Sequence, residues 1–159
     1  AVTPRFVPEG EKGKHLTRDL VERGYFVFMP NPRGSYGQGA AFGSANRRDF
    51  GGGDWRDILA GIDAVEKTMP IDGERLGLTG HSYGGFMTMW GVTHSQRFKA
   101  AVAGAGISNW ISYYGQNGID QWMVPFFGAS MYDDPAIYRA ASPIESIRNA
   151  KTPTLMNAV

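Results

Sequence analysis

The chain contains no cysteine among its 159 residues. Disulfides, thiolate metal sites and cysteine nucleophiles are therefore all excluded. The absence does not identify a compartment, because cysteine-free proteins occur in oxidising and reducing environments alike. The sequence also has no apolar run near the roughly 18 residues that a membrane-spanning helix needs, and its first residues do not resemble a signal peptide. We expect a soluble protein, with no membrane partner, in either the cytoplasm or the periplasm.

An excess of charge of one sign is lacking too. The 16 basic and 15 acidic residues are interspersed and give a formal net charge of +1. Without a basic stripe or an acidic tail, nucleic-acid binding is not expected. The glycine-rich stretch 31–53 contains neither G-x-G-x-x-G at a helix start nor G-x-x-x-x-G-K-[ST], so nucleotide binding is not expected either. We expect no cofactor and no metal ion.

The residues that are present suit one α/β domain. Hydrophobic residues make up 42% of the chain, which is enough for a single sizeable core. Apolar runs at strand length alternate with runs at helical spacing, which predicts a mostly parallel sheet flanked by helices. Strands are expected at 25–29, 75–79, 100–105 and 153–159. Helices are expected at 12–23, 54–69 and 83–93, with two short helices after residues 134 and 142.

Several polar residues are interpreted as helix caps or loop anchors. Asp54, with Asp57 three residues later, resembles a weak capping box at the start of the 54–69 helix. Asp134 before a proline, and Ser142 before Pro-Ile-Glu, are typical N-caps. We interpret Asp133 as part of the same capping signal. Arg33 is expected to hold the glycine-rich loop to a carboxylate.

The stretch Gly80-His81-Ser82-Tyr83-Gly84 carries the chemistry. It matches G-x-S-x-G, in which a sharp strand-to-helix turn exposes a serine hydroxyl above the sheet. Ser82 is therefore a candidate nucleophile, and the backbone N–H of Tyr83 a candidate oxyanion donor. The pentapeptide alone is a weak motif, but here it lies between a predicted strand and a predicted helix, as the motif requires.

None of the three histidines is a convincing base for this serine. His81 adjoins Ser82 and is expected to point to the opposite side of the turn. His94 lies about 16–18 Å further along the helix, at 1.5 Å per residue. His15 precedes the nucleophile, whereas this turn normally goes with the chain order Ser, acid, His. All three are expected to be structural or solvated.

Seven blocks of the sequence closely resemble the catalytic domain of the prolyl oligopeptidase family of serine peptidases: Asn31–Gly39, Gly51–Asp57, Gly61–Asp63, Arg75–Gly85, Arg97–Ala101, Ser108–Trp110 and Lys151–Thr154. The resemblance implies an α/β-hydrolase fold, with Ser82 as nucleophile and Tyr83 as oxyanion donor. In that family the domain usually follows a β-propeller. We therefore expect residues 1–159 to be a partial catalytic domain, incomplete at both ends, that lacks the propeller and the C-terminal triad segment.

The resemblance also implies what completes the site. The second oxyanion donor is expected just before Ala1, the triad Asp shortly after the 153–159 strand, and the His some tens of residues later. The strand before Ala1 would lie between the strands at 25–29 and 75–79. The isolated chain is accordingly expected to be poorly stable and inactive, with the missing parts of its own protein as partners.

The substrate expected from the resemblance is an oligopeptide. Trp110, Tyr113 and Tyr114 follow the strand next to the nucleophile and are candidates for lining the pocket of the residue before the cleaved bond. They could equally cover the sheet, because aromatic rings bury large areas. Two other functions remain open, namely an esterase or lipase on the same fold, or a non-catalytic remnant acting as an interaction module.

Overall fold

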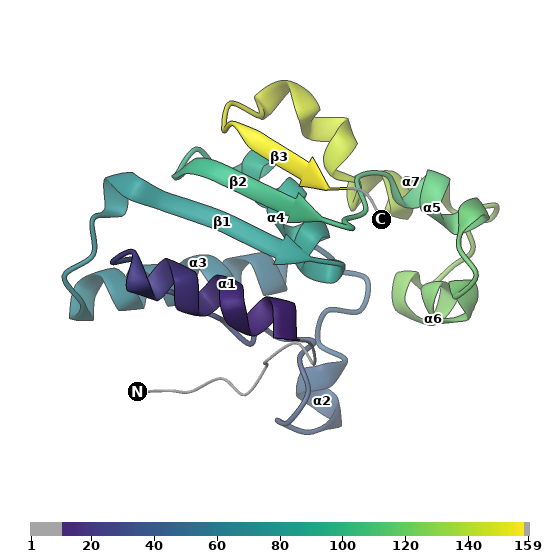
Figure 1. The fold of residues 1–159 in the computed structure, drawn as a ribbon. Coiled ribbons are helices and arrows are strands. Elements are labelled where there is room, and N and C mark those ends of the chain that lie inside the picture. The colour runs from purple at the N-terminus through teal and green to yellow at the C-terminus, as the bar shows by residue number, and fades with distance from the viewer. Residues whose placement is uncertain (1–10, 158–159) are drawn as a thin grey trace.

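A computed structural model describes residues 11–157 and contains a three-stranded parallel sheet. The strands are β1 (Leu76–His81), β2 (Phe98–Gly104) and β3 (Thr154–Asn157), in the order β1-β2-β3. All three arrows in Figure 1 point to the same edge of the sheet. The predicted parallel α/β architecture is confirmed for these three strands.

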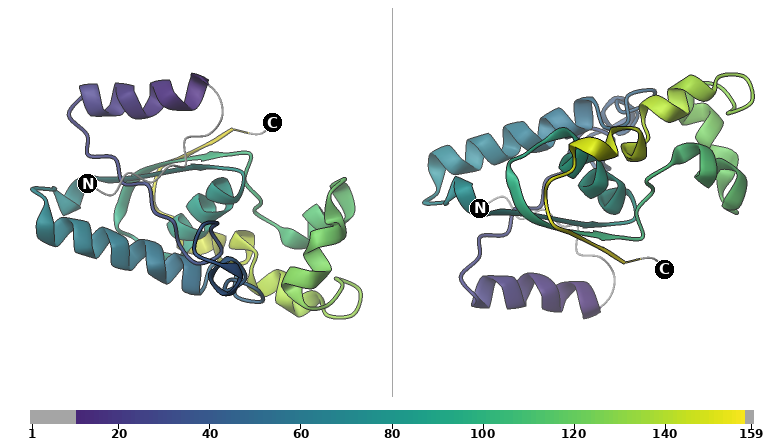
Figure 2. Two further views of the ribbon diagram at one scale, coloured as in Figure 1. Left: turned by 90° about the horizontal axis from the view of Figure 1, so that it is seen from below. Right: turned by 90° about the horizontal axis from the view of Figure 1, so that it is seen from above.

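Helices cover both faces of the sheet. Figure 2 shows α1 (Glu11–Glu22) alone on one face, with α3 (Gly53–Thr68), α4 (Tyr83–His94) and η3 (Pro143–Asn149) on the other. The remaining short elements are α2 (Ala40–Gly43), η1 (Gly73–Arg75), α5 (Trp110–Gln116), η2 (Asp120–Trp122), α6 (Met123–Phe127) and α7 (Pro135–Ala140). Within residues 11–157, no helix combines the length and the apolar character needed to cross a bilayer.

The helix α4 is buried because it is apolar on nearly every side. Phe86, Met87 and Val92 lie in the core, and the small residues of β2 allow the helix to come close. A Cβ atom on Gly85 would lie 2.3 Å from the carbonyl oxygen of Gly104. The backbone of α4 therefore lies directly against the backbone at the end of β2.

The aromatic-rich segment after β2 forms short helices that the sequence did not indicate. The Asn109 side chain accepts hydrogen bonds from the backbone N–H groups of Ile111 and Ser112, at 3.0 and 3.1 Å, and starts α5. Further along, Phe127 stacks on Tyr138 with ring centroids 4.2 Å apart. These rings extend the core beyond the edge of the sheet at which the strands end.

The predicted strand at 25–29 is wrong for the described structure. The segment lies outside the three-stranded sheet and forms no ladder with any described strand. The side chains of Tyr25 and Phe26 are 59% and 54% exposed. An aromatic and β-branched composition favours a strand only where a neighbouring strand pairs with its backbone groups, and none of the three described strands pairs with this segment.

Of the caps predicted in the C-terminal part of the chain, one is confirmed and two are wrong. The Asp134 carboxylate accepts a hydrogen bond from the Ala136 N–H at 3.1 Å and caps α7. Ser142 does not cap η3, because its hydroxyl donates to the Tyr138 carbonyl oxygen at 2.7 Å and accepts from the Trp110 N–H at 2.9 Å. Asp133 instead accepts a hydrogen bond from the Ser130 hydroxyl in the preceding turn.

The start of α3 also differs from the prediction. Its N-cap is Gly52, and the Gly53 N–H donates to the Asp49 carboxylate at 2.8 Å. Asp54 lies one residue inside the helix with its side chain fully buried. The local spacing of acidic residues identified the helix start correctly to within one residue but assigned the capping role to the wrong carboxylate.

Candidate active site

Ser82 lies on a strained turn between β1 and α4. Its backbone has φ 57° and ψ −118°, a conformation that an L-residue adopts only when its surroundings impose it. The Ser82 N–H donates to the Gly104 carbonyl oxygen at 2.9 Å, and its own carbonyl oxygen accepts from the Phe86 N–H at 3.0 Å. The residue is exposed at the carboxyl edge of the sheet, where α/β proteins place their ligand sites.

Two glycines allow the turn to close. A Cβ atom on Gly80 would lie 2.3 Å from the Gly84 carbonyl oxygen, and one on Gly85 would meet Gly104 and Gly106. A Cβ atom on Gly84 would meet no described atom within 4 Å. The second glycine of G-x-S-x-G is therefore not the one that close packing requires here; the glycine after it is.

Tyr83 presents two polar groups to its surroundings. As the first residue of α4, it has a backbone N–H without a partner inside the helix, as expected of the proposed oxyanion donor. Its ring packs between Phe50 and Phe86, with centroid distances of 5.5 and 5.2 Å. Its hydroxyl donates to the Asp54 carboxylate at 2.5 Å and accepts from the Asn46 amide at 3.5 Å.

The sequence analysis interpreted Asp54 as a helix cap and did not predict that its buried carboxyl group bonds to Tyr83, the residue next to Ser82. Burial raises the pKa of Asp54, while hydrogen bonds from the Tyr83 hydroxyl and the Trp55 N–H act in the opposite direction. Burial and the neighbouring Asp54 carboxylate raise the pKa of Tyr83 well above its usual range, so the phenol stays protonated and donates. The sequence did carry a signal, because Asp54 lies four residues before Ile58 and hence on the apolar stripe of α3.

Comparison with known proteins shows which family the chain belongs to. The model of the "Prolyl oligopeptidase family" matches residues 14–158. The chain belongs to the prolyl oligopeptidase family. It is 42% identical over 144 residues to the uncharacterized peptidase YuxL of Bacillus subtilis, which covers 89% of this chain and 22% of that protein. It is 35% identical over 146 residues to dipeptidyl-peptidase 5 of Porphyromonas gingivalis, covering 87% and 21%.

A solved structure gives the same result for the fold. The acylaminoacyl peptidase of Pyrococcus horikoshii superposes with a TM-score of 0.75 at 37% identity, over 79% of this chain and 21% of that one. The α/β-hydrolase fold expected from the sequence is therefore confirmed. The chain spans about a fifth of the length of these family members.

Neither His81 nor His94 is hydrogen-bonded to Ser82 among the residues that the structure describes. His94 stacks on Trp90 with centroids 3.8 Å apart, and its Nδ1 lies 2.9 Å from the Trp90 carbonyl oxygen, which fits the predicted structural role. His81 is exposed at the end of β1, and His15 lies in α1. In the part of the chain that the structure describes, no hydrogen bond joins a histidine to Ser82.

The three candidate substrate-contacting aromatics occupy different environments. Trp110 is fully buried, in contact with Phe50 and Phe86, and offers a substrate no surface. Tyr113 and Tyr114 are partly exposed on α5. Of the three residues, only these two have ring surface available to a ligand in this structure.

Arg33 anchors the glycine-rich loop as expected. Its Nε and Nη2 donate to the two carboxylate oxygens of Asp57 at 2.8 and 2.7 Å, and its backbone N–H donates to the same side chain at 3.0 Å. The guanidinium holds the pKa of Asp57 below its usual range. This bidentate pair ties the loop to α3, so Asp57 serves the loop and not a capping box.

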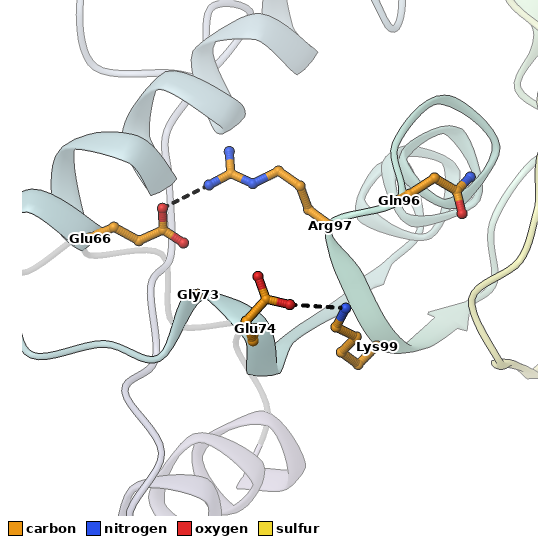
Figure 3. A pocket seen from close by; sticks show the side chains of 6 residues that line it. All are labelled: Glu66, Gly73, Glu74, Gln96, Arg97 and Lys99. Atoms are coloured by element: carbon orange, nitrogen blue, oxygen red, sulfur yellow. Dashed lines mark hydrogen bonds and ion pairs between the residues drawn. The ribbon is translucent and has the colours of Figure 1, made fainter.

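A surface cavity of about 490 Å³ lies at the other edge of the sheet. Its lining residues are Glu66, Gly73, Glu74, Gln96, Arg97 and Lys99. Figure 3 shows that the cations here are paired, Arg97 with Glu66 at 2.8 Å and Lys99 with Glu74 at 3.5 Å. The cavity adjoins the strand starts, whereas Ser82 follows a strand end, so it is separate from the candidate active site.

Proposed function

We propose that the protein containing this chain is a serine peptidase that cleaves oligopeptides through an acyl-enzyme on Ser82. The observation that carries this proposal is the exposed Ser82 on its strained strand-to-helix turn. Such a turn presents a hydroxyl to a substrate above the sheet and aims the next backbone N–H at the same place. The family membership and the peptidase relatives support peptides as the substrates.

The chemistry follows from these two groups. Ser82 Oγ attacks the carbonyl carbon of the scissile peptide bond while a base takes its proton. The carbonyl oxygen becomes an oxyanion, which the Tyr83 N–H stabilises. The base returns the proton to the nitrogen, so that collapse of this intermediate expels a neutral amine and leaves an ester on Ser82. Water, deprotonated by the same base, then attacks the ester and releases the acid while Ser82 regains its proton. We propose that the base and its carboxylate partner come from a part of the protein outside residues 1–159, as does the second oxyanion donor.

Tyr113 and Tyr114 are proposed to contact the substrate. They lie on α5, which follows the end of β2, the strand next to the nucleophile. A tyrosine offers both an apolar ring and a hydroxyl to a peptide side chain. Trp110 is proposed to support them from the core, since its ring meets that of Tyr113 edge-on at 5.7 Å.

The proposal predicts a substrate class that can be measured directly. The full-length protein is expected to release p-nitroaniline from dipeptidyl or N-acylaminoacyl p-nitroanilides, and a fluorophosphonate that modifies Ser82 should stop this release. The same assay with p-nitrophenyl esters of short fatty acids serves as the comparison. Cleavage of the esters with none of the anilides would contradict a peptidase and indicate an esterase.

A further inference from the structure

Tyr83 connects the nucleophile turn to a buried carboxylate, because its backbone and its side chain lie at different places. The backbone N–H lies at the start of α4 beside Ser82, and the hydroxyl reaches Asp54, which is 29 positions earlier in the sequence. The ring between them is confined by Phe50 and Phe86. A displacement of the hydroxyl end is therefore transmitted to the backbone of Tyr83.

The Asp54 end of this connection is rigid. Its carboxylate is fully buried, and Oδ1 accepts a hydrogen bond from the Trp55 N–H at 2.8 Å while Oδ2 accepts from Tyr83. Asp54 also lies in the first turn of α3, where the helix dipole favours a negative charge. A carboxylate buried in this way has no alternative partner in water and keeps its geometry.

The second partner of the Tyr83 hydroxyl is the Asn46 amide, at 3.5 Å. Asn46 is buried, and its Oδ1 has no hydrogen-bond partner among the described residues. The Asn46 contact is long and the Asp54 contact is short, so Asp54 determines where the hydroxyl lies. The charged acceptor also makes the stronger bond of the two.

We propose that Asp54 is a positioning residue for catalysis, which holds the Tyr83 N–H in the oxyanion site through the Tyr83 hydroxyl. This inference rests on the proposed function, since it concerns the oxyanion of that reaction. Removing a whole oxyanion donor costs about 10²- to 10³-fold in kcat. Loosening a donor that remains present should cost less, about 10- to 100-fold.

The test compares three variants of the full-length protein on a peptide p-nitroanilide. Tyr83→Phe keeps the ring but removes the hydroxyl, and Asp54→Ala removes its acceptor. Asp54→Asn keeps an oxygen that can accept from Tyr83. We expect kcat to fall about 10- to 100-fold in the first two variants with KM changed by less than about threefold, and the asparagine variant to recover most of the loss. The double variant Tyr83→Phe with Asp54→Ala should lose no more than either single variant, because the two residues act as a unit.

A loss of folded protein must be distinguished from a loss of catalysis in folded protein. Every kcat is expressed per molecule whose Ser82 reacts with a fluorophosphonate, so unfolded protein does not count. Asp63 lies on α3, as Asp54 does, and Asp63→Asn removes one ion pair of Arg97 while Arg97 keeps its pair with Glu66. This variant should leave kcat unchanged. Wild-type kcat in Tyr83→Phe would overturn this inference while leaving the peptidase proposal intact. A wild-type protein without Ser82-dependent peptide cleavage would overturn the proposed function, and this inference with it.

Discussion

Replacing Ser82 by alanine is expected to lower kcat for peptide hydrolysis by at least about 10⁴-fold, because the acyl-enzyme route is then closed. The Tyr83 N–H and the substrate contacts remain, so a small residual rate over water should persist and KM should change little. Steady-state hydrolysis of a peptide p-nitroanilide by the full-length protein measures both constants.

Ser146→Ala is the matched control for this loss. Ser146 lies in η3, is partly buried, and its hydroxyl makes no hydrogen bond within the described residues. Its kcat should stay within about twofold of the wild-type value. An alanine variant at position 82 that keeps even a tenth of the wild-type kcat would rule out Ser82 as the nucleophile.

Replacing Gly85 by alanine is expected to destabilise the domain by about 3 kcal/mol or more, at the upper end for overpacking. The added Cβ would lie 2.3 Å from the Gly104 carbonyl oxygen and 2.8 Å from the Gly106 Cα. Both neighbours are backbone atoms, so no flexible side chain can move aside. The helix α4 must then separate from β2, and the turn that carries Ser82 moves with it.

Gly84→Ala is the comparison variant for Gly85. A Cβ atom there meets no described atom within 4 Å, and alanine favours a helix over glycine by about 1 kcal/mol. Its thermal midpoint should therefore equal or exceed that of the wild type, whereas Gly85→Ala should melt far lower and exchange the amide hydrogens of β2 faster. Equal stability of the two variants would show that the close approach of α4 to β2 is not required.

Elements with strong local patterns were predictable from the sequence. β1, β2 and β3 are short apolar runs at strand length, so the strands could be placed from the sequence. α4 is apolar on almost every side, so its burial follows from composition. The position of Ser82 followed too, because a strand, a glycine-flanked serine and a helix in that order permit few other structures.

The failures concern partners that are distant in sequence. The run at 25–29 has the composition of a strand, yet pairing depends on an edge that local sequence does not specify. Asp54 was interpreted from its neighbours as a cap, although its partner is Tyr83 on another helix. Ser142 likewise bonds to Trp110 and not to its own helix. Short polar side chains serve caps and tertiary bonds equally well, so spacing alone does not distinguish these roles.

The central claim is that peptides are cleaved through an ester on Ser82, and trapping that ester tests it most directly. The full-length protein would be mixed with a peptide ester, quenched in acid during turnover, digested, and analysed by mass spectrometry. We predict that the acyl group is found on the peptide that contains Ser82 and is absent from the Ser82→Ala variant. An acyl group on a different residue, or rapid hydrolysis of the peptide ester with no acylated protein at any quench time, would contradict the account.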